Sequence, residues 1–149
     1  PLFRASAPAV VTLAVGDAPE KAEVSRVVRE VTGARFNDDI LGKIARNALA
    51  SWSRSGHLEG RVNKVRRRLE PTPYAVALAI HLAGLAGHVP ARALASGWLA
   101  VLDLDESRAA EAARDAHRRG LIDYRAGTGV VELSTARLLG VAGVADVPH

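Results

Sequence analysis

The sequence predicts a mainly α-helical protein with short β-hairpins, arranged as two helical units in tandem. Apolar residues recur at intervals of three and four in several segments, which is the spacing of one face of an α-helix. Two of these segments are followed by a glycine and then by a short segment that suits a hairpin. A chain of 149 residues is long enough for one domain or for two small ones with their own cores.

Residues 1–16 are predicted to form a strand or a docking arm. Residues 9–15 read Ala-Val-Val-Thr-Leu-Ala-Val, a run rich in β-branched side chains. Such side chains favour an extended backbone on a pleated, half-buried surface. The sequence leaves the partner of this strand open.

A first unit, with a helix-turn-helix pattern, is expected over residues 17–70. Asp17 and Glu20 have the spacing of a capping box, and Pro19 is tolerated in the first turn of a helix. The helix that follows ends at Gly33 and carries a stripe of Val24, Val27, Val28 and Val31. A second helix, residues 38–54, begins after Asn37, whose side chain is a good N-cap, and ends before Gly56. Two amphipathic helices joined by a short turn with glycine are typical of a helix-turn-helix.

The second of these helices has one apolar and one cationic face. The predicted apolar stripe consists of Leu41, Ile44, Ala45, Ala48, Leu49 and Trp52. The opposite face carries Lys43, Arg46, Asn47, Ala50 and Arg54. A cationic helix face of this kind is the pattern expected of a nucleic-acid-binding helix.

The basic character continues beyond the helix. Residues 57–69 fit either a two-stranded hairpin that turns at Gly60 and Arg61, or a short helix that uses Val62, Val65 and Leu69; we favour the hairpin. The basic side chains of this segment are Arg61, Lys64, Arg66, Arg67 and Arg68. From Gly42 to Arg68 the net charge is +7, whereas the whole chain carries +4. A basic stripe on an otherwise mildly acidic protein favours an anionic partner.

A second unit is expected over residues 71–139, because Pro71 and Pro73 break both helix and sheet. Its first helix, residues 74–86, is capped by Thr72 and is apolar nearly all round, which predicts burial in the core. A helix over residues 90–102 follows, with Leu94, Trp98, Leu99 and Leu102 directed inward. A helix over residues 106–119 is rich in alanine. The strands 121–125 and 130–134 flank a glycine-rich turn, and residues 140–149 are predicted to be a flexible tail.

The second unit resembles the winged helix-turn-helix superfamily, which combines three helices with a hairpin whose turn is called the wing. The resemblance rests on the run 73–134 and on Ala-His-Arg-Arg-Gly-Leu-Ile-Asp-Tyr at residues 116–124, which is similar to the junction of helix and strand in that family. It implies that the third helix enters the major groove and that the wing lies along phosphates. In this chain the corresponding helix also carries Glu106, Glu111 and Asp115, and only Arg125 lies beside the wing.

A similar sequence occurs earlier in the chain. Residues 53–61 align with residues 117–125 at a constant offset of 64, with identical Arg, Gly and Arg at three positions. Both copies follow an amphipathic helix and precede a predicted hairpin. We therefore interpret the chain as two tandem winged-helix-like units.

The function expected first is binding of double-stranded DNA by the first unit, as in a transcriptional regulator or in the DNA-contacting subunit of a bacterial defence or processing complex. Arg46 and Asn47 are the candidates for reading base edges, because Arg pairs with guanine and Asn with adenine. The candidates for phosphate contacts are Lys43, Arg54, Arg61, Lys64, Arg66, Arg67, Arg68 and Arg125. The few aromatic residues, of which Trp52 and Trp98 fall on apolar stripes, argue against binding to single strands.

The alternative is a protein–protein adaptor, since this fold also serves that role. A protein partner, or a second copy in a homodimer, would use the second unit or the N-terminal arm. An enzyme is not expected: we identify no catalytic residue, metal site or cofactor motif, and the chain has no cysteine. The longest apolar stretch, residues 74–86, is too short to span a bilayer, so we expect a cytoplasmic protein with no membrane contact.

Overall fold

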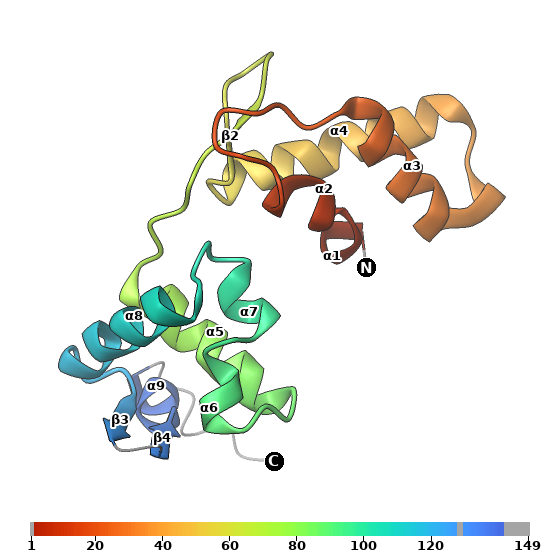
Figure 1. The fold of residues 1–149 in the computed structure, drawn as a ribbon. Coiled ribbons are helices and arrows are strands. Elements are labelled where there is room, and N and C mark those ends of the chain that lie inside the picture. The colour runs from red at the N-terminus through yellow and green to blue at the C-terminus, as the bar shows by residue number, and fades with distance from the viewer. Residues whose placement is uncertain (1, 128–129, 142–149) are drawn as a thin grey trace. The chain divides into compact units, whose positions relative to one another are not determined.

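A computed structural model describes residues 2–127 and 130–141 of the chain, which forms two compact units, Pro1–Leu69 and Glu70–His149. In the described residues each unit is mainly helical and contains a two-stranded antiparallel sheet (Figure 1). The predicted fold class, mainly α with short β-hairpins, is confirmed.

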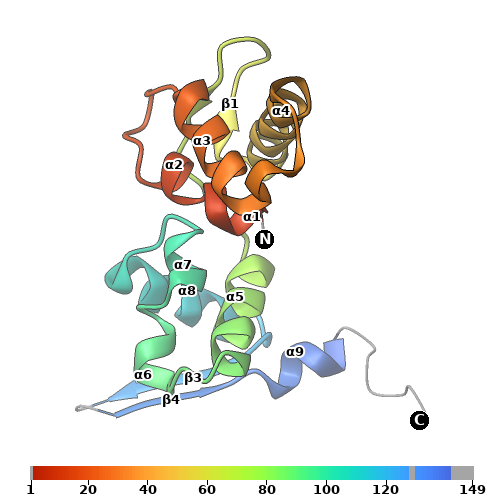
Figure 2. The ribbon, with the colours of Figure 1, turned by 90° about the vertical axis from the view of Figure 1, so that its right-hand side faces the viewer.

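Unit 1 is built around two helices that pack against each other. Its elements are α1 (Leu2–Ser6), α2 (Pro8–Val11), α3 (Lys21–Thr32), the 3-10 turn η1 (Gly33–Arg35), α4 (Asp38–Arg54), β1 (Leu58–Glu59) and β2 (Val65–Arg66). The short α1 packs against both α3 and α4 (Figure 2). The longest helix, α4, has the bounds that its sequence predicts.

The predicted strand at residues 9–15 is wrong, because the segment forms α2 and a turn. Val10 is completely buried, and the Thr12 hydroxyl donates to the carbonyl of Pro8 at 2.6 Å. Burial of Val10 together with α1 outweighs the β preference of the run, as tertiary packing often does. The N-terminal segment thus belongs to the core of unit 1 and is not an extended arm.

The predicted start of α3 at Asp17 is also wrong, because the backbone there has another partner. The Arg66 amide donates to the Asp17 carbonyl at 2.7 Å, and the Gly16 amide donates to the Arg66 carbonyl at 2.8 Å. These bonds hold residues 16–17 along the free edge of β2, so the helix begins four residues later, at Lys21. The predicted valine stripe is buried at Val24, Val27 and Val28, whereas Val31 is exposed.

Unit 2 has the hairpin after its helices. Its elements are α5 (Pro73–Leu85), α6 (Pro90–Ala93), α7 (Gly97–Ala100), α8 (Glu106–Arg118), β3 (Asp123–Gly127), β4 (Val130–Ser134) and α9 (Ala136–Val141). The Thr72 side chain caps α5 and the Asp105 side chain caps α8. The second half of the predicted turn, residues 128–129, and most of the predicted tail, residues 142–149, lie outside the described part of the chain.

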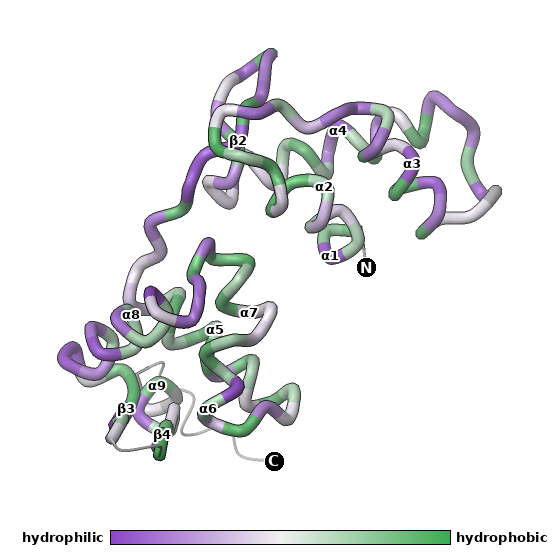
Figure 3. Tube along the Cα trace, viewed as in Figure 1, coloured by the Kyte–Doolittle hydropathy of each residue, from purple (hydrophilic) through white to green (hydrophobic). Residues whose placement is uncertain are grey.

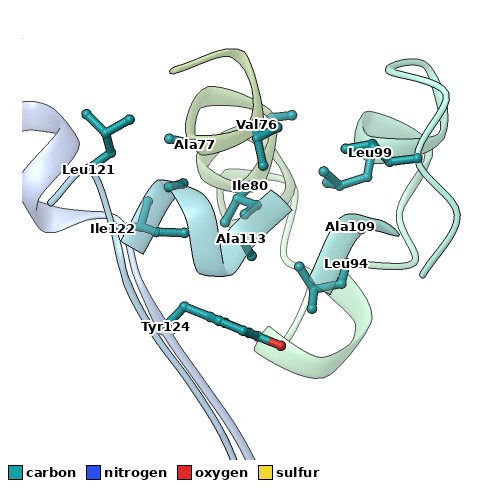
Figure 4. Packing of buried hydrophobic residues seen from close by; sticks show 13 residues of the cluster. Val76, Ala77, Ile80, Leu94, Leu99, Ala109, Ala113, Leu121, Ile122 and Tyr124 are labelled. Carbon is teal, nitrogen blue, oxygen red and sulfur yellow. The ribbon is translucent and has the colours of Figure 1, made fainter. Parts of the chain in front are cut away.

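The core of unit 2 lies between α5 and α8 and is closed by residues that lead into β3. Alanines of α8, among them Ala109 and Ala113, are fully buried and let α5 approach closely. Figure 4 shows Ile80, Leu94 and Ile122 directed into this core. The small side chains of α8 therefore fix the spacing of the two helices.

The single helix predicted over residues 90–102 is divided into α6 and α7. Leu94 and Leu99 are both buried, at 4% and 0% exposure. Residues five apart point in different directions on a straight helix, so a break at Ser96 and Gly97 is needed for both to face the core. One consequence is that Trp98, predicted to lie in the core, is 41% exposed.

The prediction that α5 is buried all round holds for only part of its surface. Figure 3 shows hydrophobic colour along nearly the whole helix. Tyr74, Leu78 and Leu85, which share one side of α5, are 59%, 51% and 72% exposed, respectively. In unit 2 this helix thus has a buried apolar face and an exposed one.

The ends of α4 and α8 repeat each other bond for bond at the offset of 64 residues. The amides of His57 and Leu121 donate to the carbonyls of Trp52 and Ala116, at 3.1 and 3.0 Å. Gly56 and Gly120 have φ angles of 86° and 73°, which favour glycine. The sequence similarity at this offset thus corresponds to the same helix termination in both units.

Candidate nucleic-acid interface

The cationic face of α4 is formed by Lys43, Asn47 and Arg54, which are all exposed. Their spacing places them along one side of the helix, and the exposed Arg46 lies at the edge of this side. The Asn37 side chain accepts from the Ile40 amide at 3.0 Å and begins the helix as predicted. Asp39, also exposed, lies one turn before Lys43, and α4 carries no acid beyond it. The cationic face is thus free of acid from Lys43 onward.

The rotation of α4 about its axis is fixed by Trp52 on the opposite side. Trp52 is fully buried, and its indole Nε1 donates to the Ser6 hydroxyl at 2.9 Å. Phe3 stacks on the indole with a ring distance of 4.0 Å, and His57 approaches edge-on at 4.7 Å. Because this large side chain has one well-defined position, the cationic face is held toward solvent.

The β1–β2 hairpin lies next to α4, and its loop, residues 60–64, contributes further cations. Strand pairing joins Leu58 to Arg66 and Glu59 to Val65, which confirms the hairpin and excludes the short helix. Gly60 has a φ of 99°, and a Cβ atom there would lie 2.0 Å from the Asn63 carbonyl oxygen. Only glycine fits this turn.

The two cations of the loop have different environments. The Lys64 ammonium donates to the Ser53 hydroxyl of α4 at 2.7 Å, which ties the loop to the helix. Arg61 is exposed, and neither cation occurs among the ion pairs of the described residues. The loop thus adds positive charge beside α4.

The basic run after the loop is not uniform. Arg66 is only 3% exposed and donates to the carbonyls of His57 and Arg67, so its role is internal to the fold. The burial of Arg66 contradicts its predicted role as a phosphate contact. Arg67 is exposed and lies 3.8 Å from Glu59, and Arg68 is exposed.

Several acids of unit 1 are occupied by other cations. Arg26 pairs with Glu23 at 2.6 Å and with Glu30, and Arg29 pairs with Asp38 at 2.6 Å. The hydrogen bond from Arg26 holds the pKa of Glu23 below its ordinary value of 4.5. Glu23 and Glu30 are thus paired within α3, and Asp38, at the start of α4, is paired with Arg29 of α3.

In unit 2, by contrast, the cations near the hairpin face acids. Arg118 and Arg119 both bond to Asp115, at 3.1 and 3.2 Å. Arg125, a predicted phosphate contact, is exposed on β3 but is paired in register with Glu132 on β4. The structure thus gathers the candidates of unit 1 around α4 and the hairpin loop, and it leaves Arg125 on the other unit.

One cation was missed by the sequence analysis. Lys21 is the first residue of α3, and it lines a groove together with Arg46, Arg61 and Lys64. A cation in the first turn of a helix opposes the helix dipole. This unfavourable position is the signal that identifies Lys21, and it follows from the observed start of α3 at Lys21. With the predicted cap at Asp17, Lys21 falls after the first three residues of the helix.

The chain matches no protein-family model, no curated protein and no solved structure. In the described residues, no helix is both long enough and apolar enough to cross a membrane. No group of three or more histidine and acidic side chains suited to a metal ion occurs in that same part of the chain.

Proposed function

We propose that unit 1 binds double-stranded DNA, with the cationic face of α4 in the major groove and the hairpin loop along the phosphates. The observation that carries this proposal is the contrast between α4, which has no acid beyond Asp39, and the corresponding helix α8, which carries Glu111 and Asp115 among its cations. Lys43, Arg46 and Arg54 of α4 have no acid partner among the ion pairs of the described residues, whereas Arg118 and Arg119 of unit 2 share Asp115. Exposed cations without acid partners are the groups that neutralise phosphates.

The order of the elements supports a winged-helix-like arrangement for both units. In each unit, a helix that ends in a left-handed glycine leads into an antiparallel hairpin. In unit 1 the helix before the hairpin is α4, and in such an arrangement this helix reads the major groove. Arg46 and Asn47 remain the proposed base-reading residues. The proposed phosphate contacts of unit 1 are Lys43, Arg54, Arg61, Lys64, Arg67 and Arg68. A transcriptional regulator and a subunit of a cytoplasmic DNA-processing or defence complex both fit this role.

The test is fluorescence anisotropy of a labelled random duplex of about 25 base pairs, titrated at about 50 and 200 mM salt. Neutralisation of four to six phosphates should lower the affinity by about two to three decades between these salt concentrations. The variant Lys43→Gln/Arg54→Gln should bind more weakly. Its matched control is Arg92→Gln/Arg114→Gln, which removes the same charge from exposed positions of unit 2. Equal loss in both variants, or no binding at low salt, would contradict the proposal.

A second candidate function, an adaptor that binds protein through unit 2, is favoured by the exposed side of α5. Tyr74, Leu78 and Leu85 form an apolar stripe there, and contiguous exposed apolar surface often marks a contact site. If the stripe joins two copies of the chain, Leu78→Lys should convert a dimer to a monomer in light scattering. The same variant should leave DNA binding by unit 1 unchanged.

A further inference from the structure

The groove that Lys21 lines lies between the start of α3, the N-terminal half of α4 and the hairpin loop. Its volume is about 520 Å³, which is in the range of small-molecule sites. Its cationic side chains are Lys21, Arg46, Arg61 and Lys64, and no carboxylate is among its lining residues. We call it the cationic groove.

Lys64 lines the groove as a cation whose hydrogen-bond partners are neutral. Lys64 is half-buried, and its ammonium donates to two neutral oxygens, the Ser53 hydroxyl at 2.7 Å and the Gly60 carbonyl at 3.5 Å. No acid of the described residues forms an ion pair with it. A partly buried cation with only neutral partners is stabilised by an anion. The charge of Lys21 opposes the dipole of α3, so an anion in the groove would stabilise Lys21 as well.

The floor of the groove is apolar and contains a glycine in mid-helix. Ala45 and Leu49 of α4 line it together with Gly42. A glycine in a helix interior costs about 0.5–1 kcal/mol relative to alanine. An added Cβ at Gly42 would lie 3.5 Å from the Arg46 guanidinium, in ordinary contact, so the fold does not require glycine here. What Gly42 provides is open space beside Arg46.

We propose that the cationic groove binds a phosphate-bearing ligand of the size of a mononucleotide. The Arg46 guanidinium forks onto the phosphate, as arginine does with phosphate oxygens, and Lys21 and Lys64 add charge. The nucleoside part lies on the floor beside Gly42. A free mononucleotide and a nucleotide of bound DNA share this chemistry, and the test separates the two sources. Binding of a free mononucleotide to the groove does not depend on the proposed DNA binding. Competition between the mononucleotide and DNA does depend on it, because both ligands would contact Arg46.

The experiment is isothermal titration of the full chain with AMP at low salt, with adenosine as the ligand that lacks phosphate. Loss of a charged hydrogen bond corresponds to a drop in affinity of about tenfold or more. We expect adenosine to bind at least this much more weakly than AMP. Lys21→Gln and Gly42→Leu should each weaken AMP binding, the first by removing charge and the second by filling the groove. Arg92→Gln, at an exposed position of unit 2, should not.

Three outcomes decide between the possibilities. If AMP binds, competes with duplex DNA and is lost in both Lys21→Gln and Gly42→Leu, the groove is a site for a free mononucleotide. If AMP does not bind at about 1 mM but both variants weaken duplex binding, the phosphate in the groove belongs to DNA, and Arg46 contacts that phosphate in place of a base edge. If neither AMP nor duplex binding responds to the two variants, the inference is overturned, while DNA binding that depends on Lys43 and Arg54 still stands. Circular dichroism checks folding, and Lys21→Gln, a surface change, serves if Gly42→Leu does not fold.

Discussion

At the scale of single residues, the Ser6 hydroxyl is a small group on which the orientation of α4 depends. It accepts the hydrogen bond of the buried Trp52 indole N–H at 2.9 Å and lies 46 residues away from Trp52 in the chain. Ser6→Ala leaves a buried N–H group without a partner, which costs about 1–3 kcal/mol. Urea unfolding should detect this loss of stability. The control is Ser107→Ala at an exposed position of α8, where the loss should be much smaller.

Gly60 determines the shape of the hairpin loop. In Gly60→Ala, the new Cβ atom meets the Asn63 carbonyl oxygen at 2.0 Å, at a φ of 99°. The loop must change its conformation, so we expect a loss of about 1–3 kcal/mol in unfolding free energy. DNA binding should also become weaker, because Arg61 is displaced together with the loop. Gly84→Ala in α5 is the matched control, since nothing lies within 4 Å of its added Cβ. The control should be neutral or stabilising by up to about 1 kcal/mol. An unchanged stability of Gly60→Ala would contradict this account of the turn.

At the scale of elements, the packing of α8 against α5 depends on alanines. Ala113 is completely buried in the core of unit 2, so Ala113→Leu has no space for its added atoms. Overpacking of this kind costs about 1–3 kcal/mol, and thermal unfolding should record it for unit 2. Ala91→Leu, at an exposed position of α6, should have little effect. DNA binding by unit 1 should be unchanged in both variants.

The elements also show how far the sequence predicts this fold. The bounds of α4 follow from its sequence, because its N-cap, its apolar stripe and its terminal glycine are all local signals. The start of α3 and the helical N-terminal segment could not be predicted, because they depend on contacts with residues far away, Arg66 and Trp52. The break between α6 and α7 arises because Leu94 and Leu99 share one core, which helical periodicity alone does not reveal.

The candidate site, like the fold, was predictable where it depends on local helical pattern and not where it depends on contacts between distant segments. The exposed cations of α4 follow from the helical pattern, and their exposure agrees with it. The burial of Arg66 does not follow, because in the sequence it is one of three consecutive arginines. The shared position of Lys21 and Gly42 in one groove could not be predicted, because the groove forms only where α3, α4 and the hairpin loop meet in the fold.

At the scale of the whole molecule, the distribution of charge predicts the response of DNA binding to mutation and salt. Arg67 and Arg68 are exposed in unit 1, so Arg67→Ala/Arg68→Ala should weaken binding to all sequences alike. The slope of log affinity against log salt should become shallower by about 2. Arg118→Ala/Arg119→Ala, the same change in unit 2, should alter neither quantity. Anisotropy titrations at several salt concentrations measure both, and equal slopes for all three proteins would contradict the assignment.

The pairing of Arg66 with Gly16 and Asp17 has a consequence for the order in which unit 1 assembles. These backbone hydrogen bonds join segments about fifty residues apart, and such contacts form slowly because a long loop must close first. Both strands of the hairpin follow the helices of unit 1 in the chain, and β2 reaches its full pairing only after the N-terminal segment has docked. The loop that carries Arg61 and Lys64 is therefore among the last parts of unit 1 to become ordered. The amides of Gly16 and Arg66 should then gain protection from hydrogen exchange together, and later than the amides within α4.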